Sequence, residues 1–201
     1  LEAEARMQIM GDGVQWEQSP LYHNEVLHCY EDVLILASRN DIEVPDTILN
    51  AVHKMACADL MWKKPDHKQL LMGDSDDMDI RDYISTAAVL FRDPMLKFGG
   101  FPVLDFESVW DLGIESARLY QEIEIQEPDF LSGALSDSGN YYLRDKWGED
   151  GSLLHFHCGT MGAGHGHSDK LHVDLCVGGE DVLTDAGRYT YVVDSGRFEF
   201  K

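Results

Sequence analysis

The chain has 201 residues, of which 44% are hydrophobic and 26% are charged, so it holds enough apolar side chains for a sizeable core. Asp and Glu number 37 against 16 Lys and Arg, which gives a formal net charge of −21. Because a negative field repels phosphate, we expect no nucleic acid and no anionic membrane surface as partner, and no run of about 18 apolar residues predicts a membrane-spanning helix.

The first part of the chain has the periodicity of helices, because apolar residues recur there at intervals of three and four. Ser19 can cap the first helix, Pro20 suits its first turn, and Pro65 stops the second. The spacing predicts helices over residues 19–39 and 45–63, a third that carries residues 83–91, and a short fourth over 106–113.

After about Pro128 the pattern changes to that of strands punctuated by glycine. Strands are predicted at residues 141–143, 152–158, 171–177 and 182–184. Helices followed by strands indicate two architectural units and an α+β organisation, not an alternating parallel sheet. We place the boundary between Gly113 and Pro128.

Histidines are concentrated in the segment MGAGHGHSDKLHVDL. His165, His167 and Asp169 alternate, so in an extended segment their side chains would face one way. Two imidazoles and a carboxylate can bind a metal or transfer a proton. His155 and His157 also share a face, and we expect them to be histidines at the edge of the core.

Three further residues are candidates for chemistry. Asp185 follows a short apolar strand, so it is either a turn residue or a metal ligand. Tyr22 and His23 open the first helix, where free backbone N–H groups favour developing negative charge, and the alternative for Tyr22 is an aromatic residue of the core.

Five segments, in this order, resemble the heparinase II/III family of polysaccharide lyases: DGVQWEQSPLYH, MGDS, FLSGALSDSGNYYLRDKW, GHGHSDKLHVDL and VLTDAGRYTY. They extend over nearly the whole chain. The resemblance implies a multidomain α+β fold. Residues 1–120 would be the last helices of an incomplete (α/α) toroid, and residues 121–201 would begin an antiparallel β-sandwich.

The resemblance also implies the reaction, a β-elimination beside a uronic acid. A base removes the proton on C5, the C4 oxygen leaves with a proton, and the new chain end is a 4,5-unsaturated uronate. Tyr22 matches the catalytic tyrosine that acts as base, acid or both, and His165 matches the catalytic histidine. His23, next to Tyr22, is a further catalytic candidate.

By the same resemblance, His167 and Asp185 match two ligands of a structural zinc found in some members, and no organic cofactor is implied. Asp169 is expected to orient a histidine or hold the turn. Gln18 and Lys170 are candidates for contacts to the substrate or to the reacting residues.

We expect the chain to be part of a longer protein and inactive alone. The group that neutralises the uronate carboxylate is expected before Leu1, and the third zinc ligand after Lys201. The implied partner is an acidic polysaccharide of heparin or heparan sulfate type. Because the chain itself carries −21, we expect sparse sulfation of that substrate. The sequence predicts neither localisation nor oligomeric state.

Two other functions stay open. HGHSD matches the start of the HxHxDH pattern of metallo-β-lactamase-like hydrolases, although Lys170 stands where that pattern has its last histidine. A non-catalytic carbohydrate-binding protein of the same fold is the second alternative.

Overall fold

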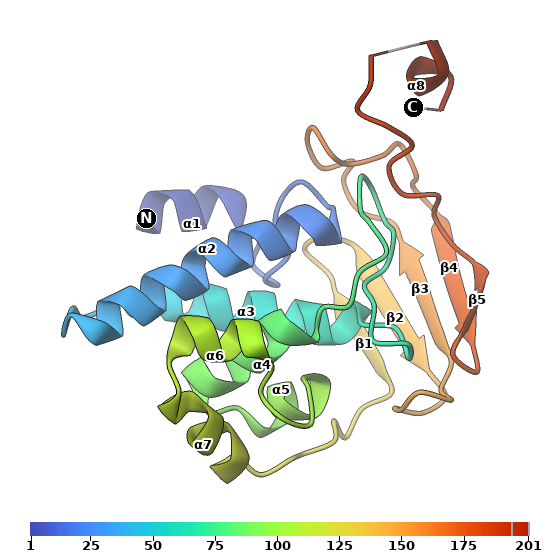
Figure 1. The fold of residues 1–201 in the computed structure, drawn as a ribbon. Helices are drawn as coiled ribbons and strands as arrows, with labels where there is room; N and C mark the ends of the chain where they lie inside the picture. Colours follow the sequence, from blue (N-terminus) through green and yellow to red (C-terminus); the bar gives the residue numbers. More distant parts are fainter. Residues whose placement is uncertain (194, 201) are drawn as a thin grey trace.

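Helices fill the first part of the chain and strands the second, as the change in periodicity predicts (Figure 1). The computed structural model describes residues 1–193 and 195–200. The helices of the first part are α1 (Glu2–Gln8), α2 (Pro20–Arg39), α3 (Asp46–Trp62), α4 (Arg81–Phe91), α5 (Pro94–Gly99), α6 (Phe106–Leu112) and α7 (Glu115–Glu122). A short helix, α8 (Ser195–Phe200), follows the strands.

The four predicted helices are confirmed as α2, α3, α4 and α6. Helices α1, α5 and α7 are absent from the prediction. Each has six to eight residues, so its period is only weakly expressed, although the pattern did indicate α6, which has seven residues. Helix α5 begins at Asp93-Pro94, directly after α4. The Asp93 carboxylate accepts hydrogen bonds from the backbone N–H groups of Met95 and Leu96, and Pro94 fills the first helical position.

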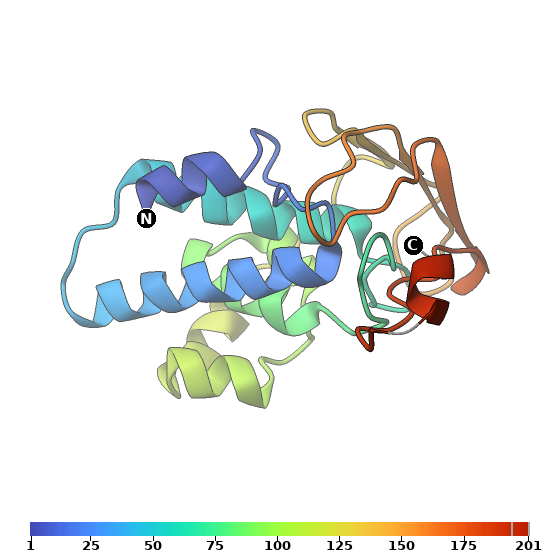
Figure 2. The same ribbon diagram turned by 90° about the horizontal axis from the view of Figure 1, so that it is seen from above.

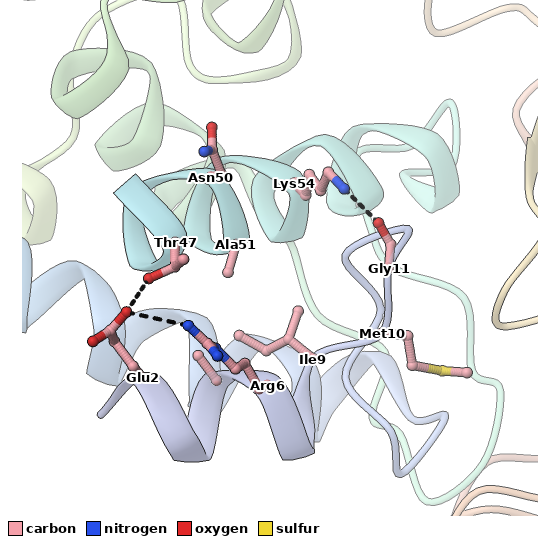
Figure 3. Close-up of a pocket in the computed structure, with 10 residues that line it drawn as sticks. Glu2, Arg6, Ile9, Met10, Gly11, Thr47, Asn50, Ala51 and Lys54 are labelled. Carbon is pink, nitrogen blue, oxygen red and sulfur yellow. Dashed lines mark hydrogen bonds and ion pairs between the residues drawn. The ribbon is translucent and has the colours of Figure 1, made fainter. Parts of the chain in front are cut away.

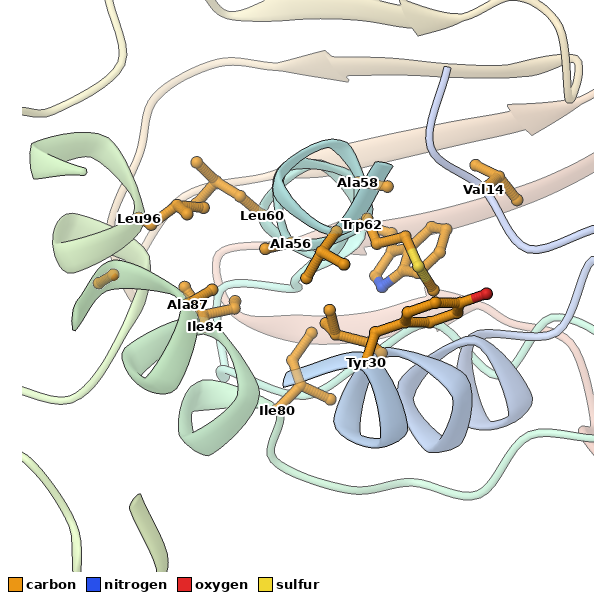
Figure 4. Packing of buried hydrophobic residues seen from close by; sticks show 14 of the residues in the cluster. Val14, Tyr30, Ala56, Ala58, Leu60, Trp62, Ile80, Ile84, Ala87 and Leu96 are labelled. Atoms are coloured by element: carbon orange, nitrogen blue, oxygen red, sulfur yellow. The ribbon is translucent and has the colours of Figure 1, made fainter. Parts of the chain in front are cut away.

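The apolar core lies between α2, α3 and α4. Figure 4 shows side chains of these helices meeting there, among them Tyr30, Trp62 and Ile84. Leu27, Val52 and Ile84 are completely buried. Burial of side chains of this size contributes roughly 1.5–3 kcal/mol each, so this cluster accounts for much of the stability of the helical part.

The second part is one antiparallel sheet whose strands follow one another in chain order. The strands are β1 (Ser132–Leu135), β2 (Asn140–Arg144), β3 (Leu153–His157), β4 (His172–Val177) and β5 (Glu180–Leu183). The four predicted strands are confirmed as β2 to β5. Strand β1 is missing from the prediction, because SGAL has neither alternation nor β-branched residues.

The sheet docks against the end of α3. Arg144 of β2 donates hydrogen bonds from Nη2 to the carbonyl oxygens of Met61 and Lys63, at 2.8 and 2.7 Å. These carbonyls belong to the last turn and its exit, where backbone acceptors lack helical partners. Gly133 of β1 faces Met61 so closely that a Cβ would lie 2.0 Å from the methionine Cε. The two parts therefore meet in direct contact.

The beginning of α2 and the loop between β3 and β4 lie at the same end of the helical part (Figure 2). The loop before α4 is joined to the loop between β3 and β4, because the backbone N–H of Asp74 donates to the carbonyl of His165 at 2.8 Å. Across residues 1–193 and 195–200, no helix is long and apolar enough to cross a membrane.

Candidate active site

The first turn of α2 is seated on the loop that contains the MGDS segment. Ser75 accepts a hydrogen bond at its Oγ from the backbone N–H of Leu21, at 3.2 Å, and its hydroxyl lies 2.9 Å from that of Ser19. Ser75 thereby satisfies a backbone donor that the start of a helix leaves free. This support fixes the position of Tyr22, which is half-buried at the surface of the turn.

Tyr22 and His165 stack face to face. Their ring centroids lie 3.4 Å apart, and the ring planes are inclined by 8°. Nδ1 of His165 is paired with the Glu17 carboxylate, which comes from the segment just before α2. A carboxylate on one ring nitrogen fixes the tautomer and the orientation of an imidazole. The tyrosine and histidine are thus held together from both parts of the chain.

A second tyrosine meets the Tyr22 hydroxyl. The hydroxyl oxygens of Tyr22 and Tyr191 lie 2.6 Å apart, and Tyr191 also donates to Oδ2 of Asp74 at 3.4 Å. Burial, the bond to Tyr22 and the negative charge of Asp74 raise the pKa of Tyr191 above its usual value. Tyr191 is therefore a neutral hydroxyl at the side of Tyr22 across the physiological range.

His167 lies between two carboxylates. Its Nε2 is 3.0 Å from Oδ1 of Asp74, and its Nδ1 is 3.6 Å from Oδ2 of Asp185. The bond to Asp185 and the bond to Asp74 outweigh partial burial and raise the pKa of His167 to about 9. Asp74 therefore links the two sequence-predicted histidine positions, since its backbone binds His165 and its side chain binds His167.

Three side chains near this point fit a divalent cation. Ligand atoms of His167, Asp169 and Asp185 all lie within 4.8 Å of one another. Oδ2 of Asp169 is buried without a hydrogen-bond partner, which is unusual for a carboxylate and fits a place beside a cation. One imidazole and two carboxylates are donors that zinc accepts.

His23 lies apart from Tyr22 even though the two are adjacent in sequence. Only 1% of it is exposed, and it faces the helical core. Its Nδ1 accepts from the backbone N–H of Gln15, and its Nε2 donates to the carbonyl of Met55, both at 3.1 Å. Burial lowers the pKa of His23 to about 3. Successive residues of a helix point about 100° apart, which separates the two side chains, and we leave His23 out of the proposed reaction.

Gln18 and Lys170, both predicted to contact the substrate or the reacting residues, also differ from each other in solvent exposure. Gln18 is 2% exposed, and its amide contacts Ser138 and Asn140 of the sheet region rather than an open site. Lys170 is exposed on the loop between β3 and β4, so it is accessible to a ligand.

The alternation of His165, His167 and Asp169 does not put them on one face. Residues 163–170 form turns and irregular loop instead of a strand. His165 faces Tyr22 while His167 faces Asp74, because Gly166 between them lets the backbone change direction. In the described part of the chain, the two histidines therefore do not share the ligand set that the hydrolase alternative requires.

Three residues of the site carry no role in the sequence interpretation: Glu17, Asp74 and Tyr191. Each lies inside a segment that carries the resemblance, QWEQS, MGDS or GRYTY. The resemblance therefore pointed to these segments, although not to these three residues. Their partners lie far away in sequence, with 148 positions between Glu17 and His165. No local pattern encodes such a pairing.

A cavity of about 310 Å³ lies elsewhere, between α1 and α3 (Figure 3). Glu2 contacts both Thr47 and Arg6 at its rim, and Lys54 reaches the carbonyl of Gly11. Its lining contains no histidine, tyrosine or cysteine. The groups suited to proton transfer lie at the start of α2 instead.

Two sequence families match the chain in succession. Residues 1–97 match the family described as Heparinase II/III N-terminus, and residues 128–197 match Heparinase II/III-like, C-terminal. A heparin-sulfate lyase from Pedobacter heparinus is 26% identical over 200 residues, which is 96% of this chain and 28% of the relative. One from Bacteroides stercoris is 22% identical over 199 residues, or 95% and 27%.

Solved structures share the fold. The heparan sulfate lyase HepC from Pedobacter heparinus superposes with a TM-score of 0.79 at 24% identity, over 98% of this chain and 29% of that one. A crystal structure of heparinase III gives 0.77 at 18% identity, over 99% and 32%. The chain thus spans less than a third of the length of the curated relatives it matches.

Proposed function

The chain belongs to the heparinase II/III family, and on that premise we propose that the full-length protein is a polysaccharide lyase for a uronic-acid-containing glycosaminoglycan of heparin or heparan sulfate type. The observation that carries the proposal is the stack of Tyr22 on His165, braced by Glu17 and Tyr191. The two curated relatives named above are heparin-sulfate lyases, which supports the choice of substrate class.

The proposed reaction is β-elimination. Tyr22, in its phenolate form, takes the proton from C5 of the uronate, the C4–C5 double bond forms, and the C4–O bond breaks. The leaving oxygen receives a proton from Tyr22 or His165. Tyr191, which stays a neutral hydroxyl, would turn its single hydrogen from Asp74 to the Tyr22 oxygen as negative charge develops there.

Glu17 determines which ring nitrogen of His165 can act on the substrate in the proposed reaction. Its carboxylate accepts the Nδ1 hydrogen of His165, which leaves Nε2 as the nitrogen available to the substrate. A positioned imidazole can exchange a proton with the sugar or donate a hydrogen bond to its carboxylate. The isolated 201 residues are proposed to lack turnover, because the remainder of the cleft belongs to the longer protein.

We further propose a structural zinc held by His167 and Asp185, with Asp169 as an additional donor. A bound cation would cross-link the loop between β3 and β4 to the segment after β5. Zinc binding requires neutral imidazole, so His167 would lose its proton on binding. The zinc takes no part in the proposed proton transfers.

The finer architecture is also a proposal, with residues 1–120 as toroid helices and residues 121–201 as the start of a β-sandwich. The solvent-facing side of the sheet supports it. Leu143, Leu154, Leu175 and Leu183 are register neighbours across β2 to β5, and Leu143 and Leu183 are 51% and 53% exposed. An apolar row of this kind is suited to contact with a second sheet.

The test is to incubate the full-length protein with a panel of uronic-acid polysaccharides and to follow the ultraviolet absorbance of the unsaturated product. We expect product from heparan-type chains of low sulfation, because the net charge of −21 repels a dense polyanion. Absence of unsaturated product across the panel would overturn the proposed function. Binding that strengthens with sulfation at low salt would contradict the preference for low sulfation.

A further inference from the structure

A row of buried polar side chains crosses the helix-facing side of the sheet. Asn140 of β2, His155 and His157 of β3, and Asp174 of β4 are at most 4% exposed. Oδ1 of Asn140 lies 2.9 Å from Nε2 of His155 and 2.8 Å from Nδ1 of His157. Nδ1 of His155 lies 2.8 Å from Oδ2 of Asp174. The reaction proposed above uses none of these groups.

The direction of every hydrogen bond in the row follows from one backbone carbonyl. The oxygen of Ser138 can only accept, so the Gln18 amide nitrogen, 3.1 Å away, must be the donor. Gln18 Oε1 then faces Asn140, whose amide nitrogen donates to it at 3.2 Å and to the Ser138 hydroxyl at 3.0 Å. Asn140 Oδ1 is left as the acceptor for the histidines.

The same logic makes Nε2 of His155 the donor to Asn140, while its Nδ1 pairs with the carboxylate of Asp174. Burial alone would raise the pKa of Asp174, but its bond to His155 and the nearby imidazoles of His155 and His172 hold that pKa below its usual value. A buried pair of an imidazole and a carboxylate is costly to maintain, and its value is often structural specificity.

Both ends of the row reach the candidate site. At one end lies Gln18, which follows Glu17 in the chain. The backbone of Gln18 has a left-handed φ of 59°. An L-residue is strained in that region and stays there only when its surroundings hold it. At the other end, Oδ1 of Asp174 accepts from the backbone N–H of Asp185 at 3.0 Å, beside His167.

We propose that Asn140 and His155 are positioning residues of this site. They hold Gln18 in its left-handed conformation and thereby keep Glu17 and Tyr22 in register with His165. Their effect on turnover rests on the proposed lyase function, whereas their effect on the conformation of residues 15–22 does not.

Asn140→Asp is the variant that separates the two ends of the row. A carboxylate still accepts from both histidines, but it cannot donate to Gln18 or to Ser138. The matched control is Cys176→Ala, a residue of β4 that is 3% exposed and lies outside the row. Loss of its buried thiol creates a cavity in the same sheet without touching the row.

The first measurement is turnover of the full-length protein. In Asn140→Asp we expect kcat to fall roughly 10- to 100-fold with KM changed less than about twofold, because the row orients reacting groups without touching substrate. Cys176→Ala is expected to lower the melting temperature and to change kcat less than about twofold. Equal kcat losses in the two variants would overturn the proposal in favour of a general packing effect.

The second measurement is hydrogen exchange, which needs no substrate. Amides of residues 15–22 are expected to exchange at least about tenfold faster in Asn140→Asp and to stay protected in Cys176→Ala. Unchanged protection of this segment in Asn140→Asp would overturn the positioning role even if the protein is a lyase. If the wild type forms no product, the lyase function fails, and hydrogen exchange still decides the positioning role.

Gln18→Gly supplies a coupling test, because glycine adopts a left-handed conformation without strain. In that background the effect of Asn140→Asp on exchange at residues 15–22 should shrink to less than about threefold. If the fold-changes in exchange caused by Asn140→Asp and by Gln18→Gly simply multiply in the double variant, Asn140 does not act through Gln18.

Discussion

The ring of His165 lies flat on the ring of Tyr22, with centroids 3.4 Å apart and planes inclined by 8°. Tyr22 belongs to the first turn of α2, and His165 to the loop between β3 and β4. The stack therefore joins the helical part to the sheet at the point where the groups proposed to transfer protons gather. Any change in the way the two parts dock will change the distance between these groups.

Removal of the Tyr22 hydroxyl tests its chemical role. We expect Tyr22→Phe to lower kcat of the full-length protein roughly 10²- to 10⁴-fold, the usual contribution of a positioned acid or base, while folding is preserved. His165→Ala should be similarly impaired. Tyr141→Phe, on the solvent-facing side of the sheet, is the control. Initial rates of unsaturated-uronate formation would decide, and full activity in both site variants would remove Tyr22 and His165 from the reaction.

Glu17 is expected to act through His165. Glu17→Gln keeps the shape of the side chain but replaces a charged acceptor by a neutral amide, which weakens the hold on the His165 tautomer. We expect kcat to fall about 10- to 100-fold and the pH–rate profile to shift. Glu25→Gln, an exposed change farther along α2, should leave both unchanged. An unaltered pH–rate profile in Glu17→Gln would show that the pair has no part in the reaction.

The burial of His23 predicts a loss of stability in acid. The folded state binds a proton at His23 only near pH 3, whereas the unfolded chain does so near pH 6.5. The unfolded state therefore gains protons first, and stability falls as the pH drops from about 6.5 toward 3, by about 2 kcal/mol at pH 5.

Urea unfolding at pH 7 and pH 5 measures this effect. Because the buried Glu31 carboxyl has a raised pKa and acts in the opposite direction, the informative quantity is the difference between wild type and His23→Gln. We expect the loss of unfolding free energy between pH 7 and pH 5 to be smaller in His23→Gln. It should persist in His28→Gln, because the side chain of His28 is exposed. Identical pH dependence in all three proteins would contradict the neutral, buried state of His23.

The proposed zinc site has its own signature. The full-length protein should contain about one zinc per chain by elemental analysis, and His167→Ala or Asp185→Asn should lose it. Tyr22→Phe should retain it, which separates metal loss from loss of turnover. Since the pKa of His167 is about 9 without metal, zinc affinity should weaken about tenfold per pH unit below that value. Equal zinc content in wild type and both ligand variants would refute the site.

Local periodicity predicted α2, α3, α4, α6 and four of the strands, because the spacing of apolar residues inside each segment indicates the type of element. It failed for α5, where Asp93-Pro94 is a helix start as well as a stop signal. It also failed for the alternating His165, His167 and Asp169, because the argument assumed an extended backbone that the glycine-rich loop does not adopt.

The residue pattern alone predicts the order of helices before strands, the family resemblance and the candidate residues Tyr22, His165, His167 and Asp185. Which of these residues meet depends on how the chain folds in three dimensions. The tertiary structure brought Glu17 to His165 across 148 positions and Tyr191 to Tyr22 across 169. It also turned His23 into the core beside its accessible neighbour. The predicted elements and the site differ in the sequence separation of the interacting residues. Helix and strand periods depend on neighbours a few residues away, whereas a site depends on how two separately formed parts dock.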